Sequence, residues 1–257
     1  MSDTIPSIEV TAPTATPYPF GLFTVAPTSI GEARWTAGIW WRSQACNLVG
    51  VTFNPCQVDD DVPAKDVNVE CSIVTAPSFT VYARSADSLA GASIADKFAN
   101  ARTALLAGEQ FAAETALWEM LLAATSSPDG TAADVQEAIA MAEAQIAAVY
   151  GGTGVIHLSR YSAIMAGTNV LSPSGTRLTT LLGSHVIAGG GYDEAPAESG
   201  AVVSVIATGG VNLVRGEVFD LGQHFDTDTN SISAVVERSY AIGWDCAAVR
   251  IETSEPA

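Results

Sequence analysis

The spacing of apolar residues changes along the chain, and each change predicts a different kind of structure. Residues 22–86 carry short runs of β-branched and aromatic residues, such as 38–41 and 79–82, which are typical of strands separated by turns. Between these runs, residues 54–63 contain two prolines and three adjacent carboxylates, which resist sheet pairing. We therefore predict an extended β loop with a charged tip over residues 22–86.

Residues 87–127 have the composition of a helix. Ala, Leu, Glu and Gln dominate this stretch, and β-branched residues are rare after Ile94. Apolar residues recur at steps of three and four, which predicts one long helix with an apolar stripe. The stripe consists of Phe98, Leu105, Ala112, Ala116, Leu117, Trp118 and Leu121.

Residues 128–257 mix helical and strand patterns. A second helix is predicted after residues 126–130, with Thr131 and Asp134 as its capping box and an apolar face at Val135, Ile139, Ala142, Ile146 and Val149. A short helix is predicted around residues 161–165. Predicted strands cover residues 155–158, 185–188, 201–208, 211–214, 231–240 and 243–251. Because helices and strands are grouped rather than alternating, the pattern favours an α+β fold of mixed sheet and helices.

The N-terminal residues 1–21 are polar and spaced by prolines. The first 25 residues contain no Lys or Arg and no continuous apolar run, so the pattern does not support a secretory signal. We predict an extended arm here. The four cysteines, Cys46, Cys56, Cys71 and Cys246, show neither C-x-x-C spacing nor the density of a secreted disulfide scaffold, which predicts reduced, mostly buried thiols in a cytosolic protein.

Composition narrows the classes of partner. Eleven basic residues against 28 acidic ones give a formal net charge of −17, which opposes wrapping around a phosphate backbone but not enclosure of nucleic acid. The mean hydropathy is +0.25, which is high for a chain in which no stretch resembles a membrane span. Much of the apolar surface is therefore expected to meet partner subunits.

One segment matches a metal-binding template. Asp226, Asp228, Asn230 and Glu237 fall at positions 1, 3, 5 and 12 of a calcium-binding EF-hand loop. Ser231 stands where that loop needs a turn glycine, and the residues after it alternate as in a strand. The pattern favours a polar turn between strands, with calcium binding as the alternative.

Other candidate chemistry is weaker, and we predict no catalytic residue, no metal site and no cofactor. His157, His185 and His224 lack metal-ligand spacing, and the closeness of Ser159 to His157 in the sequence does not make a nucleophile–base pair. The glycine runs 151–154 and 189–191 lack the residues of a phosphate-binding loop and are interpreted as turns. The carboxylates Asp59, Asp60, Asp61, Glu194 and Glu198 are interpreted as solvated loop residues.

Three indoles lie close together in the predicted β loop. Trp35, Trp40 and Trp41 are unfavourable in water, so either the loop folds back on its own core or it packs on a neighbouring subunit. The length of the predicted β loop favours packing on a neighbouring subunit. Carbohydrate stacking is the alternative, although no cluster of Asn, Asp and Arg surrounds these residues.

The order of segments resembles a known family, and four passages carry the resemblance. They are residues 179–187, with His185 where a proline is usual, the strands 201–208 and 211–214, the closing passage 235–245, and the step from strand to helix at 154–160. Together they resemble the shell-forming proteins of tailed phages, particularly those of actinobacterial hosts, with the Hong Kong 97 type capsid fold that encapsulins share.

The resemblance implies a fold and a function. Residues 1–21 would be the N-terminal arm, 22–86 the extended loop, 87–127 the spine helix, and 128–257 the mixed α/β core of the A and P domains. The protein would be a major capsid protein that assembles with itself into the icosahedral head of a virion, in the host cytoplasm, and encloses DNA without binding it specifically. A minor or pentamer-forming head protein and a soluble calcium- or sugar-binding module are the alternatives.

The resemblance also implies partners. Separate scaffolding, decoration and portal proteins would assist assembly, and no membrane is involved. Some relatives fuse their subunits through a Lys–Asn isopeptide bond, but Lys65 and Lys97 are the only lysines here and we do not predict that bond.

Overall fold

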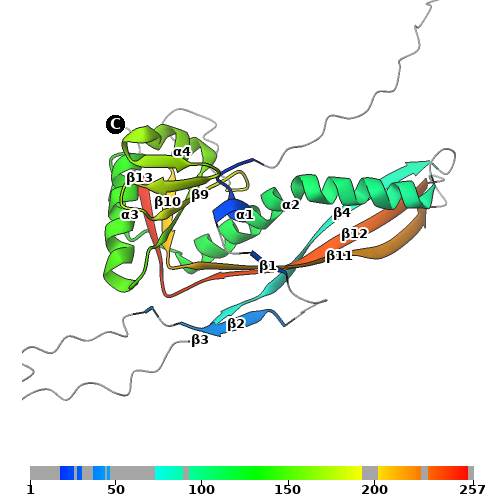
Figure 1. Ribbon diagram of the computed structural model, residues 1–257, viewed down its shortest axis with the longest axis horizontal. Coiled ribbons are helices and arrows are strands. Elements are labelled where there is room, and N and C mark those ends of the chain that lie inside the picture. The colour runs from blue at the N-terminus through cyan, green and yellow to red at the C-terminus, as the bar shows by residue number, and fades with distance from the viewer. Residues whose placement is uncertain are drawn as a thin grey trace, which may run out of the picture.

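The computed structural model of the protein describes residues 18–25, 28–30, 37–43, 45–46, 73–88, 93–192, 202–226 and 231–253. A compact end is built on a seven-stranded sheet, and a long helix and a four-stranded sheet extend side by side from it (Figure 1). The arrangement is elongated because the longest helix and the longest strands run in the same direction. Among the described residues, no helix combines the length and apolar character that a membrane span requires.

The seven-stranded sheet is mixed and has the strand order β5-β13-β10-β6-β9-β8-β7. Its strands are β5 (Gly130–Ala132), β6 (Val155–Ser159), β7 (Leu171–Ser174), β8 (Arg177–Thr180), β9 (His185–Gly189), β10 (Ser204–Thr208) and β13 (Ala248–Thr253). β6 runs parallel to β9 and antiparallel to β10, so the middle of the sheet contains both kinds of pairing.

Helices cover both faces of this sheet, which explains why β6, β9 and β10 are almost wholly buried. Helices α3 (Val135–Val149) and α4 (Arg160–Ala166) pack on one face, where Ile156 and Leu158 join their core. Helix α1 (Leu22–Val25) and the end of the long helix lie on the other face, where Val155 joins a second core. Alternate side chains of β6 therefore enter different cores.

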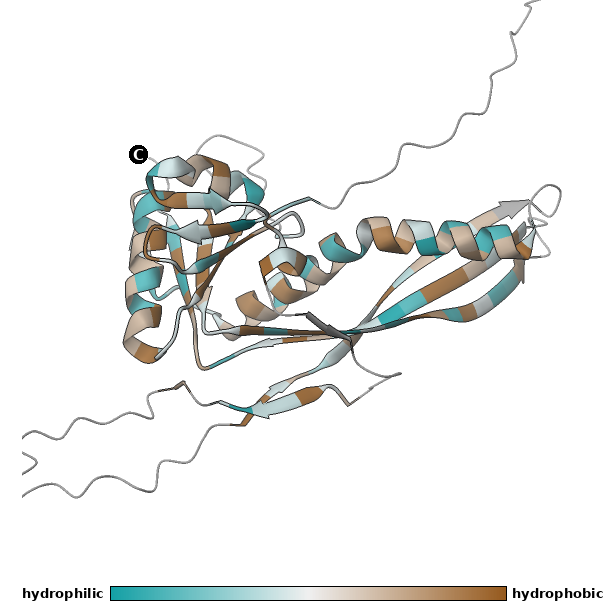
Figure 2. Cartoon of the chain, in the orientation of Figure 1, coloured by the Kyte–Doolittle hydropathy of each residue, from teal (hydrophilic) through white to brown (hydrophobic). Residues whose placement is uncertain are grey.

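The second sheet has the order β1-β11-β12-β4 and supports the long helix α2 (Ile94–Ala124). Its strands are β1 (Thr28–Ile30), β11 (Val211–Asp226), β12 (Ser231–Trp244) and β4 (Ser78–Ser88). With 31 residues, α2 is about 46 Å long at 1.5 Å per residue. Figure 2 shows hydrophobic and hydrophilic positions alternating along the long strands, as expected for a sheet with one covered face.

A capping box fixes where α2 begins. Ser93 Oγ accepts a hydrogen bond from the Asp96 backbone N–H, and the Asp96 carboxylate accepts one from the Ser93 backbone N–H at 3.1 Å. These hydrogen bonds from Ser93 hold the pKa of the Asp96 carboxyl below its usual range. The long helix is confirmed, but it starts at Ile94 rather than at 87, because residues up to Ser88 pair with β12.

The buried line of α2 differs in part from the predicted stripe. Leu105, Leu117, Trp118 and Leu121 are buried as expected, whereas Phe98, Ala112 and Ala116 are only partly buried. The buried line also includes charged and polar residues, which are Lys97, Glu109, Gln110 and Glu114. Hydrophobic spacing alone did not identify Glu109 and Glu114, because their carboxylates are paired through the tertiary structure.

A short hairpin lies below the four-stranded sheet. It consists of β2 (Ile39–Arg42) and β3 (Ile73–Ala76), and β3 leads through Pro77 directly into β4 (Figure 1). The structure differs from the predicted extended loop over residues 22–86 in two parts of that range. Leu22 is fully buried, and β4 is an integral strand of the sheet, because each residue from Ser78 to Ser88 pairs with β12.

The remaining predicted elements agree with the structure except in several details. Strand β5 was not predicted, and the predicted strand 243–251 is divided between the end of β12 at Trp244 and β13, which begins at Ala248. Asp134, not Thr131, caps α3, and its carboxylate accepts from the Glu137 backbone N–H at 2.9 Å. The hairpin β7–β8 was not predicted. β11 extends to Asp226, well beyond the predicted end at 214, because it pairs with β12 over almost its whole length.

Candidate functional site

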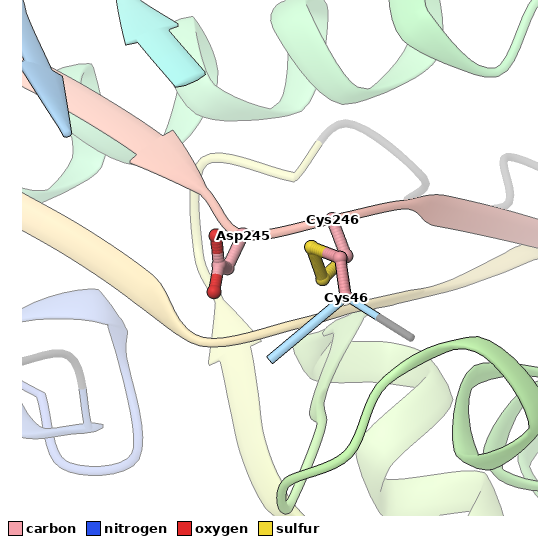
Figure 3. Close-up of side chains that lie close together, drawn as sticks. All are labelled: Cys46, Asp245 and Cys246. Carbon is pink, nitrogen blue, oxygen red and sulfur yellow. A yellow bond between two sulfur atoms is a disulfide. The ribbon is translucent and has the colours of Figure 1, made fainter. Parts of the chain in front are cut away.

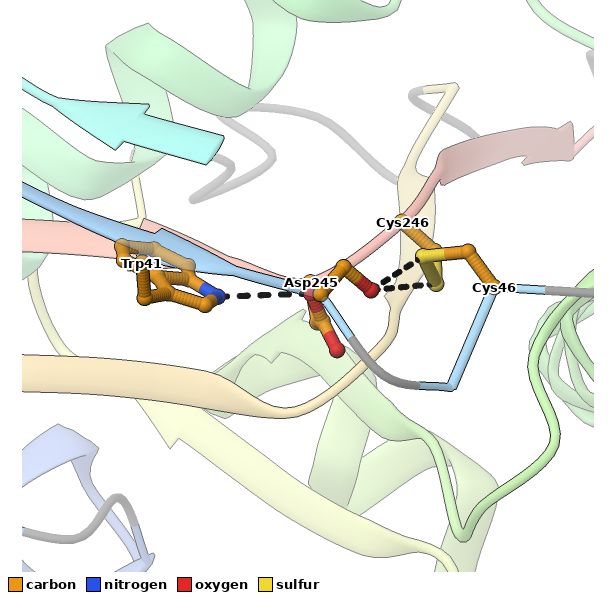
Figure 4. The surroundings of a disulfide bond; sticks show 5 residues. Trp41, Cys46, Asp245 and Cys246 are labelled. Carbon is orange, nitrogen blue, oxygen red and sulfur yellow. Dashed lines mark hydrogen bonds between the residues drawn. A yellow bond between two sulfur atoms is a disulfide. The ribbon is translucent and has the colours of Figure 1, made fainter. Parts of the chain in front are cut away.

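The residues that follow β2 are tied to the protein's own core. Trp41, on β2 itself, donates from Nε1–H to Asp245 Oδ1 at 3.3 Å (Figure 4). After β2, the backbone N–H of Gly151 donates to Ala45 O at 2.8 Å. A β-carbon on Gly243 would lie 2.7 Å from the Trp41 ring, so this glycine permits the indole to sit against β12. The start of the segment that connects β2 to β3 is therefore attached to its own subunit.

A disulfide reinforces this attachment. Cys46 and Cys246 are bonded, with their Cα atoms 5.3 Å apart and 200 residues between them in the sequence (Figure 3). Both residues are only partly buried. The prediction of reduced, buried cysteines is therefore wrong for this pair, because the fold brings together two positions whose sequence spacing gave no signal.

The same pair belongs to the one group of three potential metal ligands among the described residues. Cys46, Cys246 and Asp245 have ligand atoms within 4.8 Å of one another (Figure 3). Metals bind the thiolate form of cysteine, and a disulfide has no thiolate to offer. In this covalent state the group presents a single carboxylate, which does not make a metal site.

The predicted indole cluster divides between two environments. Trp41 is partly buried by its own chain, whereas the Trp40 side chain is 65% exposed on the hairpin. Trp35 lies outside the described residues. Packing on a neighbouring subunit thus stays a prediction for Trp40, and own-chain packing applies to Trp41.

Glu114 organises the junction between α2, α1 and the seven-stranded sheet. Its side chain is fully buried, and Oε1 accepts from the Leu22 backbone N–H at 2.9 Å and from Gln110 Nε2 at 3.1 Å. The Tyr18 hydroxyl donates to Oε2. Burial and the adjacent Glu114 carboxylate raise the pKa of the Tyr18 hydroxyl. A buried carboxylate with this many donors fixes the entry of the chain into the core.

The glycine run 189–191 completes the Glu114 site. The backbone N–H groups of Gly190 and Gly191 donate to Glu114 Oε2 at 2.7 and 3.1 Å. A β-carbon on Gly191 would lie 2.2 Å from the Phe111 carbonyl oxygen, so glycine is required where the turn meets α2. These amides therefore bind an internal carboxylate, which agrees with the interpretation of the run as a turn.

Glu109 makes the corresponding connection between α2 and the long strands. Its carboxylate accepts from the Tyr240 hydroxyl at 2.6 Å and from Arg238 Nη1 at 2.5 Å, and Arg215 Nη1 lies 3.4 Å away. Burial and the Glu109 carboxylate raise the pKa of the Tyr240 hydroxyl. One buried acid thus pairs with cations from both β11 and β12.

His157 is a core residue in a neutral state. Its Nδ1 and Nε2 lie 3.0 Å from the hydroxyls of Tyr192 and Thr208. The Thr208 hydroxyl donates its hydrogen to the Gly209 carbonyl, so it accepts from Nε2–H, and Tyr192 donates to Nδ1. Complete burial lowers the pKa of His157 to about 3.

The other predicted polar positions also have structural roles. Ser159 caps α4 by accepting from the Ser162 backbone N–H at 3.0 Å. His185 and His224 lie on separate sheets, in β9 and β11. Strand pairing separates the candidate ligands of the EF-hand match. Asp226 pairs with Ser231, whereas Glu237 lies six residues further along β12, which is about 20 Å at the rise of a strand. That separation favours the turn over the calcium loop.

Two elements at the compact end of the molecule carry exposed apolar residues. Leu182, in the turn between β8 and β9, is 84% exposed, and Ile164 on α4 is 78% exposed. Beside Leu182, a groove of about 570 Å³ runs between α3 and this turn, with Ile139 and Val170 in its wall. Tyr161, Met165 and Leu181 on the same two elements are exposed as well, and these five residues make up what we call the exposed apolar surface. A surface of this kind is typical of a contact with another protein.

Several predicted positions lie outside the described residues. They are the arm up to residue 17, Trp35, Cys56, the acidic run Asp59–Asp60–Asp61, Lys65, Cys71, Glu194, Glu198, Asp228 and Asn230. The predictions made for them stay predictions. Of the two lysines, Lys97 is described and lies buried in α2.

Comparison with known proteins identifies the fold. No protein-family model matches the sequence, and no curated protein matches it significantly. Solved structures do match over nearly the whole chain. The capsid of Ralstonia phage GP4 is similar with a TM-score of 0.52 at 12% identity, covering 100% of this chain and 97% of that one.

Two further structures agree. Mycobacterium phage Che8 has a TM-score of 0.51 at 13% identity, covering 99% of this chain and 98% of that one. A virus-like particle from Pyrococcus furiosus has a TM-score of 0.50 at 14% identity, covering 88% and 89%. The chain therefore has the α+β capsid fold of the Hong Kong 97 type, as the sequence resemblance predicted. At sequence identities this low, the structural likeness establishes the fold alone.

Proposed function

We propose that this protein is a major capsid protein that assembles with copies of itself into the closed head shell of a tailed phage. The observation that carries the proposal is the likeness to capsid structures along almost the full length of both chains. Such proteins are tiles whose extended parts overlap neighbouring tiles, and symmetric repetition of one contact closes the shell. The elongated shape and the hairpin beside the sheet suit this role (Figure 1).

The exposed apolar surface at the compact end is proposed as a contact between copies. Ile164 projects from a helix and Leu182 from the short turn between two paired strands, so contact with a neighbour would order little further chain. We propose a second copy as the occupant because the capsid fold works by repeated contacts between identical chains. The exposed Trp40 on the β2–β3 hairpin would supply a second contact of the same kind.

The acidic composition supports enclosure of DNA rather than binding. A formal charge of −17 repels the phosphate backbone, so packaged DNA would not adhere to the inner surface. Assembly in the host cytoplasm, separate scaffolding, decoration and portal partners, and the absence of catalysis belong to the same proposal. Fold likeness extends to phages of both Ralstonia and Mycobacterium, so it does not favour an actinobacterial host.

The alternatives have less support. A minor or pentamer-forming head protein would have the same fold and differ only in its place in the shell. A soluble calcium-binding module would need Asp226 and Glu237 close together, and their positions in the β11–β12 hairpin oppose this. A sugar-binding module would need polar partners around the indoles, and Trp41 instead donates to Asp245 within the subunit.

Electron microscopy of the purified protein tests the proposal. We expect closed particles of uniform diameter when the protein is concentrated, with rings or partial shells at lower concentration. Uniform monomers at every protein and salt concentration would contradict the shell function.

Substitution of the apolar surface tests which face makes the contact. Leu182→Asp and Ile164→Asp should each abolish particle formation because a carboxylate would be buried between copies without a partner. The variants should keep the unfolding temperature of the parent, since both side chains are exposed. Leu182→Met is the matched control and should assemble normally. Normal particles from both aspartate variants would exclude this surface as the contact.

A further inference from the structure

The disulfide joins two parts of the molecule, each of which has packing or strand pairing of its own. Cys46 follows β2, and Cys246 lies in the bend between β12 and β13. Neither cysteine belongs to one of the two hydrophobic cores, and the β2–β3 hairpin has its own backbone pairing from Ile39↔Ala76 to Arg42↔Ile73. The bond therefore joins the start of the segment between β2 and β3, residues 43–72, to the bend after β12, and we use the name excursion for this segment.

The surroundings hold the two sulfurs in position before the bond forms. Cys246 has a φ of +58°, in the left-handed region that a non-glycine residue rarely occupies, and this bend directs its side chain toward Cys46. Ser43 Oγ lies 2.6 Å from Cys46 Sγ and 3.6 Å from Cys246 Sγ (Figure 4). The Ala45–Gly151 and Trp41–Asp245 hydrogen bonds hold the same segment independently of the sulfurs. The thiols would thus stay adjacent in the reduced protein.

We propose that Cys46 and Cys246 form a redox latch on the excursion. In reducing solution the two thiols are free, and the start of the excursion is held by the Trp41–Asp245 and Ala45–Gly151 hydrogen bonds and by the packing of Trp41 against Gly243. Under oxidising conditions the disulfide closes a loop of 200 residues and locks the start of the excursion to the bend after β12. The consequence for the shell rests on the proposed function, whereas formation of the bond does not.

The chemistry of closure requires an oxidant, for which a small-molecule disulfide such as oxidised glutathione suffices. One protein thiolate attacks the reagent, forms a mixed disulfide and releases one thiol. The second protein thiolate then attacks the mixed disulfide and releases the second thiol. Two protein thiols lose two electrons and two protons in total, and the reagent gains them.

Selective cleavage tests the bond directly. The chain has only two lysines, Lys65 in the excursion and Lys97 buried in α2, so a lysine-specific protease acting on the folded protein should cut after Lys65. In the full chain carrying Cys56→Ser and Cys71→Ser, only Cys46 and Cys246 can then join the two fragments. Oxidised protein should run as one full-length band without reductant and as two bands with it.

The matched control adds Cys246→Ser to the same background. It should give two bands whether or not reductant is present. Two bands from the oxidised parent without reductant would overturn the latch. A full-length band that persists in the Cys246→Ser control would also overturn it, because the linkage would not involve that cysteine.

Thermal unfolding measures what the bond does to the protein. The oxidised protein should unfold about 5–10 °C above the reduced one, and Cys46→Ser should remove this difference while Cys56→Ser and Cys71→Ser keep it. Equal unfolding temperatures with and without reductant would contradict a stabilising latch. A protein that forms particles but never forms the bond, even with oxidised glutathione, would refute only the latch. A bond in a protein that never assembles would refute only the shell function.

Discussion

Single buried polar residues make specific hydrogen bonds within the hydrophobic cores of this molecule. His157 is the clearest example, because its two hydrogen bonds fix one neutral tautomer within the central strand of the seven-stranded sheet. Burial lowers its pKa from 6.5 to about 3, whereas the unfolded chain keeps the ordinary value. Below pH 6.5 the unfolded state therefore binds a proton that the folded state does not.

Stability should consequently decrease as the pH is lowered from about 6.5 toward 3. A single group contributes a slope of at most about 1.4 kcal/mol per pH unit in this window and none above it. His157→Asn should reduce the slope of the free energy of unfolding against pH by up to about 1.4 kcal/mol per pH unit. Urea unfolding at several pH values measures this slope. His224→Asn, at an exposed position on β11, should leave the slope unchanged. Parallel curves for the parent and His157→Asn would contradict the argument.

At the scale of elements, an ionic cluster acts together with the buried apolar residues of α2 to position this helix on its sheet. Glu109 projects from the helix onto Arg215 of β11 and Arg238 and Tyr240 of β12. A second pair, Arg102 with Asp220 at 2.8 Å, links the same elements but is largely exposed to solvent. Loss of a buried ion pair lowers the free energy of unfolding more than loss of an exposed one, because the remaining buried partner cannot be hydrated.

Glu109→Ala should lower the free energy of unfolding by about 3 kcal/mol, because Arg238 and Tyr240 would stay buried without their partner. Asp220→Ala removes the exposed pair and should lower it by less than about 1 kcal/mol. Urea unfolding of both variants measures the contrast. Equal effects would show that the Glu109 cluster does not anchor the helix.

At the scale of the whole molecule, charge and apolar surface oppose each other in assembly. Each copy carries a formal charge of −17, so neighbouring copies repel, while exposed apolar residues such as Leu182 and Ile164 favour contact. Salt screens the repulsion over distances of about 10 Å at 0.1 M and leaves apolar contacts largely unaffected. The balance between these terms should set the conditions under which shells form.

Light scattering at fixed protein concentration should therefore show faster assembly as sodium chloride is raised from about 0.02 to about 0.3 M. Sucrose at matched osmolality is the control and should not reproduce the acceleration. Assembly that slows with salt would indicate that attraction between unlike charges, rather than apolar contact, holds the copies together.

Local patterns predicted much of the fold but few of the interactions that position the candidate site. The helices α2 and α3 and the strands β6, β9 and β12 were predicted because each has a clear period or composition. β4 was placed in the wrong unit, because an edge strand of the core sheet and a strand of an extended loop have the same alternation. Glu109 and Glu114 were missed because a buried acid is recognisable only once its donors are known.

The sequence by itself determined the order of segments, the α+β class, the acidic charge and the resemblance to capsid proteins, because composition and periodicity are local properties. Tertiary structure alone decided that Cys46 meets Cys246, that Trp41 returns to its own core, and that the amides of residues 190 and 191 bind Glu114. Each of these contacts joins positions far apart in the chain. Such pairings depend on how sheets and helices pack together, and no local pattern records that packing.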